Sequence, residues 1–267
     1  MTEGKVDFTG VKWGSVEWTM LCTLYLRAYE SRSNHSILGD HAAAEAMDRI
    51  DYDFDRMKSL RPSSNQFLVA LRAKQLDVWA TDFLARHPDA IVLHLGCGLD
   101  SRAFRLDLPA GVDWFDVDVP TVVELRRQVY SEHDRYQMIG SSVTDPEWLD
   151  RIPADRPVLV VAEGLLPYLT ENEVRQLLQR LTDRFPTGEL MFDGIPPWGA
   201  KVMKIFRWGI RDGHQLEQWN PRLRFLEKAS IFSHFAEIPA RGIRAVYRLT
   251  NAIPACRNFS RMYRFGF

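Results

Sequence analysis

Cysteine is scarce in this sequence and does not occur in closely spaced pairs. Its 267 residues include only Cys22, Cys97 and Cys256, an odd number without a Cys-x-x-Cys motif. Such widely separated cysteines exclude the disulfide framework that stabilises small secreted domains. We therefore expect reduced thiols and a cytoplasmic protein.

Long apolar runs and metal-binding motifs are also missing. The sequence contains no run of eighteen apolar residues, and residues 1–10 are polar, so it predicts no membrane-spanning helix and no export signal. No His-Glu-x-x-His motif or Cys/His cluster is present, and we expect no metal site. Residues 51–55 resemble the start of a calcium loop, but Arg56 and Pro62 occupy the positions that need glycine and glutamate. We interpret this segment as a solvated acidic turn.

An excess of charge of either sign is absent as well. Thirty-four basic and thirty-five acidic residues give a formal net charge of -1, so no global field attracts nucleic acid or an anionic membrane. A small-molecule partner fits this balance better. With 46% hydrophobic residues the chain can bury a substantial core, and its length is near the upper limit for one domain. We expect one catalytic domain with appended segments, and the sequence does not predict an oligomeric state.

The centre of the chain alternates between strand and helix patterns. Short apolar runs typical of buried strands occur at residues 91–95, 112–117, 136–139, 158–162 and 189–192. Helices are expected at residues 120–130, at about 147–152, and after the capping-box pattern of Thr170 and Glu173. Alternation with short links predicts a doubly wound α/β unit with a mostly parallel sheet and helices on both faces.

The flanking segments have helical patterns of their own. Amphipathic helices are expected at residues 15–30, 41–50 and 67–86, and residues 1–66 are predicted to form a helical cap on a domain of residues 67–267. Beyond Pro196, residues 198–210 and 222–235 could each form a helix, whereas residues 241–267 have no clean period. We predict a lid or substrate segment at residues 196–236. Its aromatic side chains fit a pocket for a flat acceptor and a core helix equally well.

Glycines mark the end of the first predicted strand of the α/β unit. Gly96-Cys-Gly98 follows it directly. In open α/β sheets ligands bind at the carboxyl ends of the strands, and glycine lets a ligand approach the backbone closely. On this motif alone, a plain strand-to-helix turn is as good an interpretation as a binding site.

Two acids at the end of the second strand strengthen the case for a site. Asp118 follows Gly98 by twenty residues, the spacing at which such folds place a carboxylate on a ribose. Asp116 and Asp118 share one face, so we expect one to bind the sugar and the other to cap the next helix. A nicotinamide dinucleotide would use similar elements. Asp100 in the glycine turn suits a cationic ligand better than a pyrophosphate, but an NAD-dependent oxidoreductase stays open as an alternative.

Several blocks of the sequence together carry a family resemblance. They are Leu24-Tyr-Leu-Arg-Ala28, Ile37-Leu-Gly-Asp-His-Ala42, Arg72, His94-Leu-Gly-Cys-Gly-Leu-Asp-Ser-Arg102, Trp114-Phe-Asp-Val-Asp-Val-Pro120, Ala162-Glu-Gly-Leu-Leu-Pro-Tyr-Leu169 and Trp219-Asn-Pro221. From about residue 15 to its end, the chain resembles the leucine carboxyl methyltransferase-like family, and within it the polyketide-synthesis O-methyltransferases. The resemblance implies a Rossmann-like class I methyltransferase sheet and S-adenosylmethionine as the cofactor.

The resemblance also implies roles for individual residues toward that cofactor. Arg72 matches the arginine that pairs with the methionine carboxylate, a task suited to a planar fork of donors. Gly96 and Gly98 match the loop under the methionine portion, and Asp118 matches the ribose acid. The other matches are Glu163 beside the amino-acid part, Tyr168 over the cofactor and facing the acceptor, and Ser142-Val143 against the adenine.

The sequence departs from the family pattern at two of these places. Ser142 stands where an aspartate is usual, with Asp145 as a possible substitute, and Pro167 replaces a common methionine. The resemblance implies methyl transfer to a carboxylate or hydroxyl of a small, polyketide-type metabolite. Modification of a protein C-terminal carboxylate, as in the wider family, is an alternative. No catalytic residue is assigned; if a hydroxyl had to be deprotonated, His214 and His234 would be the side chains to test.

Overall fold

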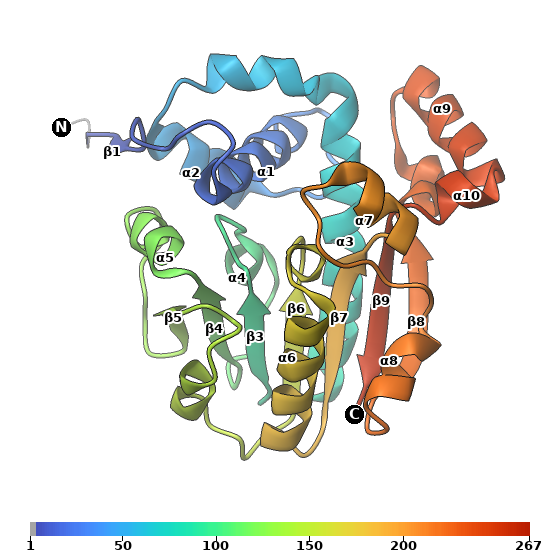
Figure 1. The fold of residues 1–267 in the computed structure, drawn as a ribbon. Coiled ribbons are helices and arrows are strands. Elements are labelled where there is room, and N and C mark those ends of the chain that lie inside the picture. The colour runs from blue at the N-terminus through green and yellow to red at the C-terminus, as the bar shows by residue number, and fades with distance from the viewer. Residues whose placement is uncertain (1–3) are drawn as a thin grey trace.

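A computed structural model describes residues 4–267, which are built around one seven-stranded sheet. The strand order is β5-β4-β3-β6-β7-β9-β8, and β9 runs opposite to the other six strands (Figure 1). The strands are β3 Ile91–Leu95, β4 Asp113–Asp118, β5 Tyr136–Gly140, β6 Val158–Ala162, β7 Gly188–Gly194, β8 Arg224–Ser230 and β9 Arg261–Gly266. The predicted α/β fold with a mostly parallel sheet is confirmed, and its strand order reverses between β3 and β6.

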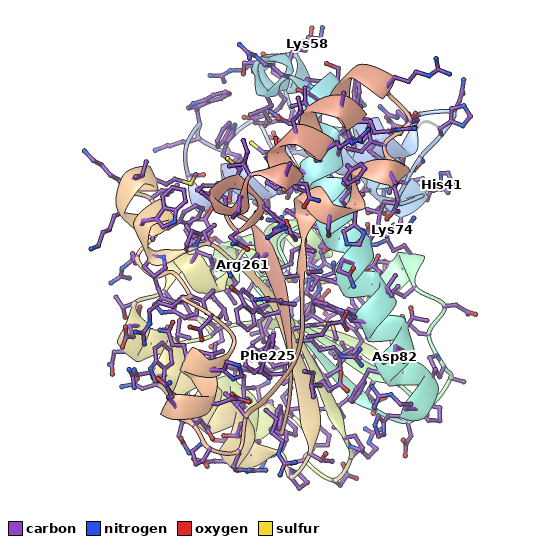
Figure 2. All side chains as sticks on the ribbon, turned by 90° about the vertical axis from the view of Figure 1, so that its right-hand side faces the viewer. His41, Lys58, Lys74, Asp82, Phe225 and Arg261 are labelled. Atoms are coloured by element: carbon purple, nitrogen blue, oxygen red, sulfur yellow. The ribbon has the colours of Figure 1, made fainter. Side chains whose placement is uncertain are left out.

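Helices cover both faces of this sheet. One face carries α3 Pro62–Arg86 and α5 Pro120–Arg127, and the other carries α6 Glu171–Arg184, the 3-10 helix η2 Glu147–Arg151 and α8 His214–Trp219. Figure 2 turns the β8 edge toward the viewer, with Asp82 of α3 on one side of the sheet and Phe225 of β8 toward the other. The sheet is therefore the middle layer of three.

The local sequence explains why the central elements form where they do. Every side chain of β3 and β6 is buried, as expected for strands covered on both faces. Helix α6 begins at a complete capping box, in which Thr170 accepts from the Glu173 N–H and Glu173 accepts from the Thr170 N–H. The predictions for these elements are confirmed.

The N-terminal elements lie above the carboxyl ends of the parallel strands (Figure 1). They are β1 Val6–Asp7, α1 Val16–Ser31, α2 His41–Arg49, β2 Ile50–Asp51 and the 3-10 helix η1 Phe54–Leu60. Helix α3 starts at Pro62, earlier than predicted, because proline suits the first turn of a helix. Residues 1–3 of the predicted cap lie outside the described residues, and the division of the chain after residue 66 stays a prediction.

The C-terminal part departs from the sequence-based expectation. The helix predicted at residues 222–235 is wrong, because residues 224–230 form edge strand β8 and only Ile231–Glu237 are helical, as the 3-10 helix η4. The helix predicted at 198–210 is shorter, α7 Pro197–Met203. Residues beyond 240 form α9 Arg241–Ala252, α10 Pro254–Arg257 and β9. Strand β8 pairs with β9, so a distant partner and not its own periodicity decides its conformation.

None of the helices within residues 4–267 is both long enough and apolar enough to cross a membrane.

Candidate cofactor site

The glycine turn after β3 is the floor of the candidate site. Gly96 and Gly98 have φ angles of +63° and +51°, in the left-handed region that favours glycine. A Cβ on Gly98 would lie 3.1 Å from the Cβ of Met20 in α1, and one on Gly96 would lie 3.0 Å from a Leu165 methyl carbon. Both glycines are therefore needed for backbone geometry and for space, and α1 packs directly on the turn.

Asp118 lies beside this turn at the carboxyl end of β4. Its Oδ2 accepts from the Gly98 N–H and its Oδ1 from the Val119 N–H, each at 2.8 Å. Burial raises the pKa of Asp118. Each carboxylate oxygen has two lone pairs and accepts one backbone hydrogen bond, so both can still accept from a vicinal diol such as a ribose. The structure thus brings Asp118 to the turn, and its contact with the sugar stays a prediction.

Asp116 has a different position from the one expected. It does not cap the following helix, because its side chain is completely buried. Its carboxylate accepts hydrogen bonds from the side chains of Arg126, Tyr136 and Trp114. It also accepts one from Nδ1 of His94. Burial acts to raise the pKa of Asp116, but Arg126, His94 and Tyr136 together outweigh it and lower the pKa to about 2. Arg126 also donates to the carbonyls of Gly98 and Asp100, so Asp116 supports the glycine turn from below.

Asp100 also corrects a sequence-based interpretation. Its side chain is 4% exposed and lies within ion-pair distance of three guanidinium groups, at 2.5 Å from Arg27, 2.6 Å from Arg105 and 3.3 Å from Arg102. Despite burial, these arginines hold the pKa of Asp100 well below its usual value. The interpretation that Asp100 presents its charge to a cationic ligand was wrong, because that charge is compensated inside the protein.

Arg72 extends from α3 to the carboxyl ends of β6 and β7. Its Nε donates to Glu163 and its Nη1 to Asp193, both at 3.0 Å. Its Nη2 makes no hydrogen bond within residues 4–267, and the side chain is 19% exposed. Arg72 therefore keeps donors for a ligand carboxylate. Sequence reasoning missed Asp193, although an acid near the carboxyl end of a buried strand is a signal for a site.

Glu163 is held between two arginines. Arg72 binds its Oε1, and Arg102 of the short helix α4 Arg102–Arg105 donates to its Oε2 at 2.5 Å. Arg102 is completely buried and also donates to Asp77 of α3 at 2.6 Å. Burial acts to raise the pKa of Glu163, yet the two arginines lower it to about 2. Glu163 thus positions Arg72, and sequence reasoning missed Arg102 and Asp77 as its supports.

The remaining predicted cofactor residues lie at the ends of neighbouring elements. Tyr168 ends the 3-10 helix η3 Leu166–Tyr168, is 36% exposed, and has its ring 5.0 Å from that of Phe206. Burial raises its pKa, so the phenol stays protonated. After β5, Ser142 shares a 2.7 Å hydrogen bond with Thr144, and Val143 is buried in the apolar cluster on the α6 face. Their adenine contacts stay a prediction.

The two histidines considered as bases pair with neighbours on their own segments. His214 contacts Glu217 at 2.6 Å and His234 contacts Glu237 at 3.0 Å. Helix α8, which carries His214, lies near the amino ends of the parallel strands, away from the glycine turn (Figure 1). His214 is therefore not placed to act at this turn.

Three features lie at the carboxyl ends of the parallel strands, where the strand order reverses. They are the glycine turn, the carboxylate of Asp118 beside it, and Arg72 with its unused donors. These groups fit S-adenosylmethionine, because Asp118 can accept from its ribose and Arg72 can bind its carboxylate. The fold and the site define the class of S-adenosylmethionine-dependent methyltransferases.

Comparisons with known proteins identify the family. Residues 21–182 match the model of the leucine carboxyl methyltransferase family, which is more than half of the chain. The chain is 45% identical to the tetracenomycin polyketide synthesis O-methyltransferase TcmP of Streptomyces glaucescens, over 94% of this chain and 97% of that protein. It is 35% identical to the S-adenosyl-L-methionine-dependent methyltransferase dpfgK of Gibberella zeae, over 93% and 92% of the two chains.

A solved structure supports the fold. A putative methyltransferase from Thermobifida fusca has a TM-score of 0.56 and 17% sequence identity, covering 90% of this chain and 93% of that one. The chain belongs to the leucine carboxyl methyltransferase family. It is an S-adenosylmethionine-dependent O-methyltransferase, which confirms the predicted enzyme class and cofactor.

Proposed function

We propose that this enzyme transfers the methyl group of S-adenosylmethionine to a carboxylate or hydroxyl oxygen of a small, polyketide-type metabolite. The observation that carries the proposal is the 45% identity to a polyketide synthesis O-methyltransferase over nearly the full length of both chains. The α/β scaffold and the residues around the glycine turn support the same reaction.

The bound cofactor supplies an electrophilic methyl group on a positively charged sulfur. The protein has to hold this donor, align the acceptor and exclude water. Asp118 binds the ribose hydroxyls, and Arg72, held by Glu163 and Asp193, binds the amino-acid carboxylate. Met20 of α1 packs on the glycine turn, and Tyr168 of η3 would close over the bound cofactor and keep water out.

The state of the ionisable groups around Arg72 favours a carboxylate acceptor over a hydroxyl. Glu163 and Asp193 are both engaged by Arg72, and the raised pKa of Tyr168 keeps its phenol protonated. These groups are therefore poor general bases. A carboxylate is already ionised at neutral pH and needs no base, whereas a hydroxyl must lose a proton.

The test compares acceptors with matched ring systems. The enzyme is incubated with S-adenosylmethionine and with anthraquinone-2-carboxylate, 2-hydroxyanthraquinone, or a peptide that ends in a free leucine carboxylate, and products are identified by mass spectrometry. We expect a base-labile methyl ester of the aromatic acid. Methylation of the peptide but of no small molecule would contradict the proposal and support the protein-directed alternative.

We further infer a cytoplasmic enzyme that acts on a small molecule and not on nucleic acid. The three cysteines, which form no disulfide, and the formal net charge of -1 support this inference. Residues 1–66 are proposed to cap the site. The lid proposed at 196–236 rests on α7 and the loop after it, because residues 224–230 belong to the sheet.

A further inference from the structure

A second hollow lies outside the glycine turn, between the start of α6 and the segment of residues 197–219. Its volume is about 410 Å³, within the range of small-molecule pockets. It is lined by Glu171, Arg175, Pro197, Ala200, Lys201, Phe206, Arg207, Trp208, Gly209, Arg211, Gln215 and Trp219. The cofactor residues predicted from the sequence are not part of this lining.

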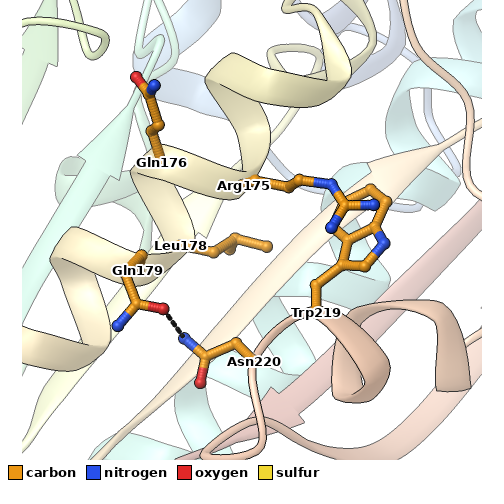
Figure 3. A pocket seen from close by; sticks show the side chains of 6 residues that line it. All are labelled: Arg175, Gln176, Leu178, Gln179, Trp219 and Asn220. Carbon is orange, nitrogen blue, oxygen red and sulfur yellow. Dashed lines mark hydrogen bonds between the residues drawn. The ribbon is translucent and has the colours of Figure 1, made fainter.

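Three aromatic side chains line the hollow, Phe206 and the two indoles of Trp208 and Trp219. The ring centroids of Trp208 and Trp219 are 5.9 Å apart, and the Arg175 guanidinium carbon lies 3.9 Å from the Trp219 centroid. Figure 3 shows the Arg175 guanidinium stacked on the Trp219 ring, in the adjoining hollow of about 210 Å³ that shares these two residues with the larger one. Trp208 is 4% exposed, and its Nε1 is buried without a hydrogen-bond partner in the described chain. An unpaired buried donor is costly, so an acceptor brought to this nitrogen by a shift of the lining side chains would be favourable.

The lining is also strongly basic. It contains four cations, Arg175, Lys201, Arg207 and Arg211, and one acid, Glu171, which leaves 4 − 1 = 3 positive charges. Glu171 pairs with Arg175 at 2.7 Å, and Arg207 lies 3.5 Å from Glu173. Lys201 and Arg211 have no ion-pair partner among residues 4–267. This local excess contrasts with the formal net charge of -1 for the whole chain and favours an anion.

The hollow is joined to the acceptor side of the enzyme through one segment. Phe206 lines the hollow and contacts the ring of Tyr168. The next two residues, Arg207 and Trp208, donate their backbone N–H groups to the Pro167 carbonyl at 2.8 and 3.2 Å. The wall of the hollow and the turn that carries Tyr168 are therefore hydrogen-bonded neighbours.

We propose that this hollow is a second ligand site that binds a planar aromatic carboxylate. The flat ring packs against the partly exposed rings of Phe206 and Trp219, and Lys201 and Arg211 are available for the carboxylate. Such a ligand belongs to the class of acceptors proposed above, and only this choice of ligand rests on the proposed function. Because methylation would remove the charge of a carboxylate, the site would hold the acid and release the ester.

The test measures binding of 2-naphthoate and its methyl ester by calorimetry, with the enzyme saturated with S-adenosylhomocysteine. The double variant Lys201→Gln/Arg211→Gln should bind 2-naphthoate at least tenfold more weakly. The matched control Arg224→Gln/Lys228→Gln removes two exposed cations of edge strand β8 and should bind it like the wild type. Trp208→Phe, which removes the buried donor, should weaken binding several-fold. Affinity for S-adenosylhomocysteine should stay unchanged in all variants.

Each outcome of this experiment bears on the site. The second ligand site would be overturned if the wild type and the double variant bound 2-naphthoate equally. It would also be overturned if the control variant lost as much affinity as the double variant, or if the wild type bound the acid and its methyl ester equally. A methyl-transfer assay on the same proteins separates the two proposals. Charge-dependent binding without methyl transfer to any small acid or phenol would leave this site standing and contradict the proposed function. Methyl transfer with binding that does not depend on Lys201 and Arg211 would overturn this site and leave the proposed function standing.

Discussion

The two faces of the central sheet are built from different chemistry, although they share the same strands. Neighbouring residues of β3 and β4 point to opposite faces, so Leu93 and Phe115 pack with α6, whereas His94 and Asp116 lie on the side of α3 and α5. The α6 face is a continuous apolar cluster. The α3 face adds a buried network of arginines and carboxylates near the carboxyl ends of the strands.

This difference separates two tasks. Apolar burial stabilises the sheet without specifying the position of any loop, whereas buried ion pairs contribute little net stability but need one geometry. On the α3 face, Arg126 and Arg102 hold the glycine turn and Glu163. Arg27 of α1 and Asp40 before α2 extend the same network into the cap. The charged face therefore positions the site, and the apolar face supports it.

Acid should produce the largest difference between the two faces, because it discharges several network carboxylates together. The pKa values of Glu163 and Asp116 are about 2 in the folded protein, below the ordinary values of 4.5 and 3.8. Their stabilisation is complete above the ordinary values and is lost as the pH falls toward 2. Hydrogen exchange should show amides of α1 and α2 losing protection before those of α6. Earlier or simultaneous loss in α6 would break the comparison.

Removing one arginine from the buried network of arginines and carboxylates should have the next largest effect. Arg102→Met leaves Glu163, Asp77 and Asp100 short of a partner and should cost about 3 to 5 kcal/mol of unfolding free energy, measured by urea denaturation. It should also weaken S-adenosylhomocysteine binding, because Glu163 no longer fixes Arg72. A variant that unfolds more easily but binds the cofactor product normally would show that the network is only structural.

The matched change on the apolar face is Leu177→Ala in α6. Leu177 is 1% exposed, and its truncation should cost about 2 to 5 kcal/mol of unfolding free energy through lost burial and a cavity. Calorimetry at a temperature where the variant is folded should find unchanged affinity for S-adenosylhomocysteine. A large loss of affinity here would mean that the two faces do not have separate tasks.

Asp118→Ala tests the carboxylate at the end of β4, beside the glycine turn. It should weaken S-adenosylhomocysteine binding by about 1.5 to 3 kcal/mol, which is at least about tenfold in the dissociation constant. A second variant, Asp145→Ala, removes the exposed acid after β5 that could substitute for the usual adenine aspartate. An unchanged dissociation constant for Asp118→Ala by calorimetry would remove this residue from the site, and a large effect of Asp145→Ala would place the adenine beside it.

The smallest effect is expected at the start of α6. Thr170→Ala removes the hydroxyl that accepts from the Glu173 N–H and should cost about 1 kcal/mol in thermal or urea unfolding. Methyl transfer should be unaffected, because the cap only satisfies the helix end. If transfer falls with stability kept, the turn between Tyr168 and Thr170 has a further role.

Much of this architecture follows from short segments of sequence. Residues 91–95 and 158–162 were predicted as buried strands with the bounds that the structure has, and Thr170 was predicted as the cap of α6. The glycine turn and Asp118 were also predicted to lie together. Strand β8 was predicted as a helix, because an exposed edge strand has no strong period and depends on pairing with β9.

The sequence by itself determined the alternating strands and helices, the glycine turn and the acid beside it, since these depend on periodicity and on neighbours a few residues apart. Only the tertiary structure decided that Asp100 is neutralised, that Asp116 is buried, and that Arg72 meets an acid 121 residues away. Ion pairs form between side chains that packing brings together, and their energies depend on burial and distance. A linear sequence specifies neither quantity locally.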